Sequence, residues 1–206
     1  MKIKTKIILL VLIVIIIFLV FFLKNNYKNL KVGNNMSNKS IEEIEKYILN
    51  ISSYKAKIEM IVNSNKTTNK YVLLQTYEKP NKTKQIILEP SNIEGLETEY
   101  DGQNLIIKNT KLNLSKVYEN YEIIVNNYMT LEAFISSYES LKENNKTKIY
   151  EENNNVIMEV EEETNNYIYK KSLYISRDTG APSKLMIEDI NGEKLVYILY
   201  NEIEIK

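Results

Sequence analysis

The chain has 206 residues, 27 of them basic and 27 acidic, and it contains neither cysteine nor histidine. These absences exclude thiol catalysis, serine–histidine catalysis and the usual ligands of zinc and haem, so an enzyme would have to rely on carboxylates, Lys, Tyr or Ser. Because the charge is balanced and no basic stripe is present, nucleic acid is not expected as a partner. We expect no catalytic residues, no cofactor and no bound metal.

The N-terminus predicts a membrane anchor. Three lysines precede an apolar run of seventeen residues, Ile7 to Leu23. As a helix this run would be roughly 26 Å long, which is close to the thickness of the hydrocarbon core of a bilayer. The run is longer than the apolar part of a signal peptide and lacks small residues for cleavage, so we favour an uncleaved anchor over a cleaved signal. The residues expected to mark it are Ile7, Leu10, Ile13, Ile17, Val20 and Leu23.

Four segments follow from this interpretation: a cytoplasmic tail at 1–6, the anchor at 7–23, a polar stalk at 24–37 and one domain at 38–206 outside the cytoplasm. Lysines flank the anchor on both sides, so the positive-inside rule gives little guidance. We place the tail inside because a short basic tail inside and a large domain outside is the commoner arrangement.

The domain should begin with a helix. Asn38 or Ser40 can cap it, and isoleucines then recur at spacings of three and four from Ile41 to Ile51. We expect this helix to end near Ser52. A second helical pattern covers 121–142, with Thr130 as a cap.

Alternating polar and apolar residues with turn signals between them predict eleven strands. Asp101-Gly102 and Asn191-Gly192 are the strongest hairpin signals. The order of helix, strands, helix, strands predicts an α+β fold with helices lying on a strongly curved antiparallel sheet. The expected strands are 54–62, 71–77, 84–88, 97–100, 104–108, 112–117, 148–151, 156–162, 167–176, 181–190 and 194–204.

Two polar motifs have a structural and a chemical interpretation. Asp178-Thr179-Gly180-Ala181 spells the active-site tetrad of aspartic peptidases, but these enzymes need two such aspartates and the chain has one copy. We favour a turn with glycine at its positive-φ position. The glutamates between Glu159 and Glu163 could suggest a cation site, yet neighbours on a strand point to opposite faces, so we favour a solvated or edge strand.

Aromatic residues are candidates for lining a lipid or ligand cavity, although ordinary packing of tyrosine in a sheet is the favoured alternative. The apolar face of the second helix is expected to pack in the core. The candidate cavity residues are Tyr71, Tyr77, Tyr167, Tyr169 and Phe134.

Short runs along the domain resemble a known superfamily. They are Ile51-Ser52-Ser53-Tyr54-Lys55-Ala56-Lys57, Asn63-Ser64-Asn65-Lys66, Tyr77-Glu78-Lys79-Pro80-Asn81-Lys82, Tyr100-Asp101-Gly102 and Asp178 to Leu185. The pattern resembles the LolA/RseB-like superfamily and, within it, the clostridial germination lipoproteins related to GerS. The resemblance implies an incomplete antiparallel β-barrel covered by helices. It supplies no catalytic residue.

The resemblance also implies a role. LolA relatives carry acyl chains of lipoproteins, RseB relatives sense such ligands and regulate a membrane partner, and GerS relatives assist a cortex-processing amidase. We therefore expect a non-enzymatic, membrane-anchored protein of sporulation or germination that binds a protein partner such as this amidase, in the cell or spore membrane. A carrier or sensor of acyl chains is the alternative, and it would need a few hundred cubic ångströms of connected apolar space. GerS is held by a lipidated cysteine, which this chain lacks, so the Ile7–Leu23 helix would replace the lipid.

Overall fold

The computed structural model describes residues 36–64, 66–121, 129–164 and 167–206, with the backbone alone at 163–164 and 167–169. These residues belong to the second of two compact units, residues 32–206. Within the described ranges, none of the helices has the length and apolarity needed to cross a membrane. The predicted anchor residues, from Ile7 to Leu23, lie outside the described ranges.

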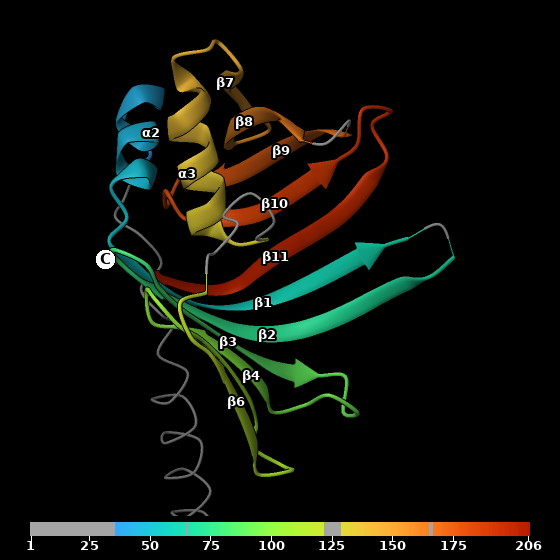
Figure 1. Ribbon diagram of the computed structural model, residues 1–206. Helices are drawn as coiled ribbons and strands as arrows, with labels where there is room; N and C mark the ends of the chain where they lie inside the picture. The colour runs from blue at the N-terminus through green and yellow to red at the C-terminus, as the bar shows by residue number, and fades with distance from the viewer. Residues whose placement is uncertain (1–35, 65, 122–128, 165–166) are drawn as a thin grey trace, which may run out of the picture. The chain divides into compact units, whose positions relative to one another are not determined.

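One antiparallel sheet contains all eleven strands, as the sequence predicts. Its strand order is β6-β5-β4-β3-β2-β1-β11-β10-β9-β8-β7, so the first and last strands of the domain pair at its centre (Figure 1). The sheet is open, because β6 and β7 lie at opposite ends of this order, so the predicted antiparallel sheet is confirmed and its strands do not close into a barrel. The strands are β1 (Ser53–Asn63), β2 (Thr68–Glu78), β3 (Lys82–Glu89), β4 (Leu96–Tyr100), β5 (Leu105–Asn109), β6 (Leu114–Tyr118), β7 (Thr147–Glu152), β8 (Asn155–Thr164), β9 (Tyr167–Ser176), β10 (Pro182–Glu188) and β11 (Lys194–Ile205).

Helix α2 (Ile41–Leu49) begins with a capping box, in which the side chains of Ser40 and Glu43 each accept a hydrogen bond from the backbone N–H of the other residue. The prediction that it reaches Ser52 is wrong by about one turn. The side-chain amide of Asn50 donates to the Lys46 carbonyl at 2.7 Å and ends the helix. Ser52 then donates its backbone N–H to Lys206 beside β11.

Helix α3 (Leu131–Lys142) begins after Thr130, whose hydroxyl accepts from the Ala133 N–H as predicted. The helical pattern does not extend to Tyr121, which follows a turn and has no helical backbone. The intervening residues 122–128 lie outside the described ranges. Both helices contact β7 and β8.

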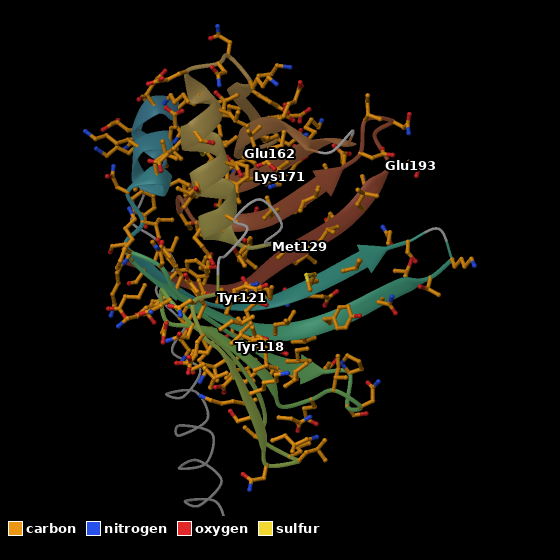
Figure 2. The ribbon with its side chains drawn as sticks, viewed as in Figure 1. Tyr118, Tyr121, Met129, Glu162, Lys171 and Glu193 are labelled. Atoms are coloured by element: carbon orange, nitrogen blue, oxygen red, sulfur yellow. The ribbon has the colours of Figure 1, made fainter. Side chains whose placement is uncertain are left out.

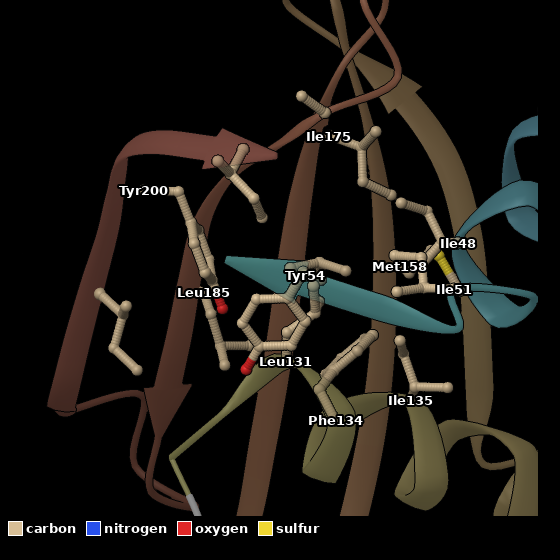
Figure 3. Packing of buried hydrophobic residues seen from close by; sticks show 14 of the residues in the cluster. Ile48, Ile51, Tyr54, Leu131, Phe134, Ile135, Met158, Ile175, Leu185 and Tyr200 are labelled. Atoms are coloured by element: carbon tan, nitrogen blue, oxygen red, sulfur yellow. The ribbon is translucent and has the colours of Figure 1, made fainter. Parts of the chain in front are cut away.

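The core lies between these helices and one face of the sheet (Figure 3). Phe134 and Tyr138 of α3 are 1% exposed, and their rings lie 5.9 Å apart. The phenol of Tyr138 donates to Glu45 at 2.8 Å, which joins α3 to α2. Strand residues at alternating positions complete this core: Val156, Met158, Val160, Leu173, Ile175, Leu185, Ile198, Ile58 and Leu73.

Candidate functional site

Strand β6 forms one free edge of the sheet. All five of its residues are exposed, and its apolar side chains are exposed on both faces: Leu114 is 62% exposed and Val117 52%. One side of β6 pairs with β5, and no strand among the described residues pairs with the other side. Leu112, in the preceding turn, is 65% exposed. Backbone donors and acceptors therefore lie beside an exposed apolar patch, which we call the β6 edge: Leu112, Leu114, Val117 and Tyr118.

A pocket of about 760 Å³ lies where the first half of the sheet meets α3. Three segments build it: the turn between β2 and β3, the hairpin between β4 and β5 with the turn after β6, and the first turns of α3. The lining is mixed in character, with three tyrosines, two carboxylates and one lysine. Its members are Ile51, Tyr77, Lys79, Pro80, Asn81, Thr83, Tyr100, Gly102, Gln103, Asn120, Tyr121, Thr130, Glu132, Ala133, Ile135, Ser136 and Glu139.

Helix α3 presents one stripe to this pocket. Glu132, Ile135, Ser136 and Glu139 are spaced by three, four and seven positions, which places them on one face of a helix. Phe134 and Tyr138 lie on the opposite face of the helix and enter the core. The helix therefore divides its two faces between the core and the pocket, and both carboxylates belong to the pocket face.

Glu132 is the acid of the pocket that a buried tyrosine contacts. The phenol of Tyr54 donates a short hydrogen bond of 2.5 Å to its Oε2. Burial raises the pKa of the Glu132 carboxyl, and its hydrogen bond with Tyr54 offsets part of that rise. Burial and the nearby charges of Glu132 and Glu139 raise the pKa of Tyr77, which lines the same pocket.

Tyr200 of β11 lies behind Glu132. Burial and the Glu132 charge raise the pKa of Tyr200 well above its usual range. Its phenol oxygen is buried and has no hydrogen-bond partner among the described residues. The rings of Tyr54 and Tyr200 both extend toward the start of α3, near Leu131 (Figure 3). A buried polar cluster thus adjoins the pocket, and part of its hydrogen-bonding capacity is unused.

A second cavity of about 210 Å³ adjoins the first and shares Thr83 and Tyr100 with it. Gln75 lines it and is 2% exposed, with a buried amide oxygen that has no partner in the described part of the chain. The remaining lining is Met60, Gln85, Thr98, Leu105 and Met129. The pocket and the adjoining cavity together are large enough for a ligand, but polar side chains interrupt their apolar lining.

The predicted cavity residues lie in different places. Tyr77 lines the larger pocket. Tyr71 is partly buried against the core, and Phe134 is inside the core. Tyr167 and Tyr169 belong to β9, but their side chains lie outside the described atoms. Sequence reasoning missed Tyr100, Tyr121 and Glu132, of which Glu132 carried a signal: it lies in the predicted first turn of α3, seven positions before Glu139.

The Asp178 tetrad forms a turn, as expected, in which Gly180 has a φ of +68°. A Cβ at this glycine would lie 2.6 Å from the Cγ of Met36, so close packing also requires glycine. Asp178 accepts a hydrogen bond from the side-chain amide of Asn154 at 3.1 Å. Across the described ranges no group of acidic residues is arranged to hold a metal ion.

The interpretation of the acidic segment as a solvated or edge strand needs correction. Strand β8 is internal, because β7 lies outside it. Glu162 is buried and forms an ion pair with Lys171 at 2.8 Å (Figure 2). Glu159, on the opposite face, accepts from Tyr150 and Ser172 and lies 3.5 Å from Lys170. Cationic and hydroxyl partners on neighbouring strands therefore balance these carboxylates.

Comparison with known proteins gives a family and several similar folds. None of the curated proteins matches the sequence. The structure of the CwlD amidase from Clostridioides difficile in complex with the GerS lipoprotein contains a similar chain, with 24% identity, a TM-score of 0.49, and coverage of 80% of this chain and 93% of that one. A LolA superfamily protein from Nitrosomonas europaea is similar at 10% identity, a TM-score of 0.42 and coverage of 81% and 94%. The MucA/MucB complex of Pseudomonas aeruginosa is similar at 13% identity, a TM-score of 0.45 and coverage of 80% and 56%.

The family comparison spans almost the whole sequence. The chain matches the family described as sporulation protein YdcC-like over residues 4–206. GerS and LolA superfamily proteins, which the sequence motifs resemble, are among the similar structures. The chain belongs to the sporulation protein YdcC-like family.

Proposed function

We propose that this chain is a non-enzymatic, membrane-anchored protein outside the cytoplasm that binds and assists a protein partner during sporulation or germination. Its family supports the biological setting. The apolar run Ile7–Leu23 supports the anchor. The observation that carries the proposal is the β6 edge, because large apolar side chains flank an unpaired strand there. The motif resemblance to the GerS relatives suggests a cortex-processing amidase as the partner.

The β6 edge suits an extended segment of the partner. Such a segment can add a strand to the sheet, so that main-chain hydrogen bonds hold it and side chains on both faces select it. Leu114 and Tyr118 are on one face of β6 and Val117 is on the other. Anchoring both proteins to one membrane raises their effective concentration up to about the millimolar range, so a weak interface suffices.

The test is the affinity of the full chain, in detergent micelles, for a purified cortex-processing amidase from the same organism. We expect the double variant Leu114→Glu/Val117→Glu to weaken binding at least tenfold, because it places two charges where apolar contacts form. Ile190→Glu is the matched control, since Ile190 is 69% exposed and lies in the turn after β10. Unchanged affinity of the double variant would reject the β6 edge as the interface, and no binding by the wild type would reject the amidase.

The anchor can be tested separately in cells. Deletion of residues 2–24 should weaken germination strongly and leave amidase binding in solution unchanged, because it removes tethering alone. A deletion variant that restores full germination at native expression would show that tethering is not needed.

Carriage of an acyl chain is the second candidate, and the 760 Å³ pocket favours it by volume. Its mixed lining does not favour a long apolar chain. Mass spectrometry of lipids bound to the purified protein distinguishes the two functions, since a carrier should retain a stoichiometric acyl ligand.

A further inference from the structure

We propose that the 760 Å³ pocket receives a lysine or arginine side chain of the protein partner, with Glu132 as its acceptor. This inference rests on the proposed partner-binding function and specifies the chemistry that the partner must present. The pocket would add a side-chain contact to the main-chain contacts offered by the β6 edge.

The charges of the pocket favour a cation. Glu132 and Glu139 are its acidic members, and Lys79 is its single basic member. Among the described residues, neither glutamate forms an ion pair, whereas Glu97 pairs with Lys84 and Lys108. The pocket thus contains one more negative charge than positive charge, and its acids have no cationic partner in the described part of the chain.

Its aromatic walls favour the same occupant. Tyr77 of β2, Tyr100 of β4 and Tyr121 after β6 all line the pocket. An ammonium or guanidinium group is attracted to the face of an aromatic ring within about 6 Å of its centre. The chain uses this contact elsewhere, since the Lys184 ammonium lies 3.4 Å from the centre of the Tyr174 ring.

The buried tyrosines behind Glu132 provide an independent argument. Tyr200 is 8% exposed, its phenol has no hydrogen-bond partner among the described residues, and burial together with the charge of Glu132, which Tyr54 contacts, raises the pKa of Tyr200. A half-buried carboxylate without a cation is destabilised, and its partial burial accordingly raises the pKa of Glu132. An incoming cation would offset this cost by pairing with the carboxylate.

The experiment measures the binding of capped tripeptides to the full chain in detergent micelles. The probes are Gly-Lys-Gly, Gly-Arg-Gly and the neutral control Gly-norleucine-Gly. Selective labelling of tyrosine with nitrogen-15 reports the site: the Tyr77 and Tyr100 amide signals should shift, while those of Tyr150 and Tyr174, on the opposite face of the sheet, should not. We expect the charged peptides to bind at least tenfold more tightly than the norleucine peptide.

Two variants should weaken binding of the lysine peptide, and a third should strengthen it. Glu132→Gln, which keeps the shape and the acceptor oxygen, should weaken lysine-peptide binding about tenfold. Glu139→Gln, at an exposed position, should weaken it about twofold. Lys79→Gln should strengthen it about twofold, because it removes a like charge. Thermal unfolding of each variant verifies folding, and Glu139→Gln and Lys79→Gln keep the test valid if Glu132→Gln is unstable.

The proposal is overturned if norleucine binds as well as lysine, if the shifts occur away from the pocket, or if Lys79→Gln weakens binding. These peptides do not pair with the β6 edge, so the Leu114→Glu/Val117→Glu variant should bind them normally. Failure of peptide binding with normal amidase binding would reject the pocket alone. Absence of amidase binding by the wild type and by every variant would reject the proposed function.

Discussion

The two halves of the sheet use the same strand pattern for different purposes. In the half formed by β7–β11, helices α2 and α3 cover one face, and core residues such as Met158 and Leu173 are fully buried. In the half formed by β2–β6, most inward side chains are only partly buried, and β6 is exposed throughout. The difference predicts that the covered half supplies most of the stability, and the proposed binding surface lies in the open half.

The edges repeat this contrast. Strand β7 contains charged residues and contacts both helices, which protects it from pairing with another chain. Strand β6 has one charged residue, Lys116, and its apolar side chains are exposed on both faces. We therefore expect mutations in the two halves to separate stability from binding.

The largest expected effect tests this separation directly. Phe134→Ala should lower the free energy of unfolding by about 3–5 kcal/mol, because it removes a fully buried ring from the covered half. Leu114→Ala should change it by less than about 0.5 kcal/mol, because Leu114 is exposed. Urea unfolding of the full chain in micelles measures both. Similar losses for the two variants would show that the open half contributes equally to stability.

A smaller loss of unfolding free energy should follow from removing the N-terminal cap of helix α2. Ser40→Ala removes the hydroxyl that accepts from the Glu43 N–H, and it should lower the unfolding free energy by about 1 kcal/mol. Ser136→Ala is the control, since Ser136 is exposed on α3 and alanine favours helices. If Ser40→Ala proves neutral, then the cap of α2 does not contribute to the stability of the covered half.

The smallest effects concern pH. Burial raises the pKa of Glu132, so ionising it costs stability as pH rises through the interval between its unfolded and folded pKa values. Glu132→Gln should therefore be more stable than the wild type at pH 7, and this advantage should disappear below pH 4. Thermal unfolding across pH 3–8 measures the difference, and a destabilised variant at pH 7 would contradict it.

Glu97, in the open half, should show the opposite sign. Hydrogen bonds from Lys84 and Lys108 lower the pKa of Glu97, so its stabilising contribution is present above its usual pKa and is lost as pH falls through the lowered value. Glu97→Gln should cost about 0.2–1 kcal/mol at pH 7 and nothing at low pH. The same pH series measures it, and equal profiles for the two glutamine variants would refute the assignment.

Local patterns were sufficient to predict the strands. Alternation of apolar residues predicted all eleven, and Thr130 and the two glycine hairpins were identified from residue type alone. These features depend on neighbours in sequence. The pairing of β1 with β11, which sets the strand order, depends on residues far apart and left no local signal.

The pocket was harder to predict for the same reason. Tyr71 and Tyr77 are on one face of β2, but at about 3.3 Å per residue they are roughly 20 Å apart, so only Tyr77 reaches α3. Periodicity gives the face of a residue but not what covers it. The buried pair of Glu162 and Lys171 shows the same limit, since their partnership follows from the register of β8 and β9.

The seam between β1 and β11 has a consequence for how the domain is made. Each half is a meander of consecutive strands that can form as the chain emerges, but the seam joins segments such as Ser52 and Lys206, which are 154 positions apart. Closing such a loop is slow relative to forming hairpins. Until β11 has formed and paired with β1, the two half-sheets would each expose an unpaired inner strand, which leaves the nascent domain prone to aggregation.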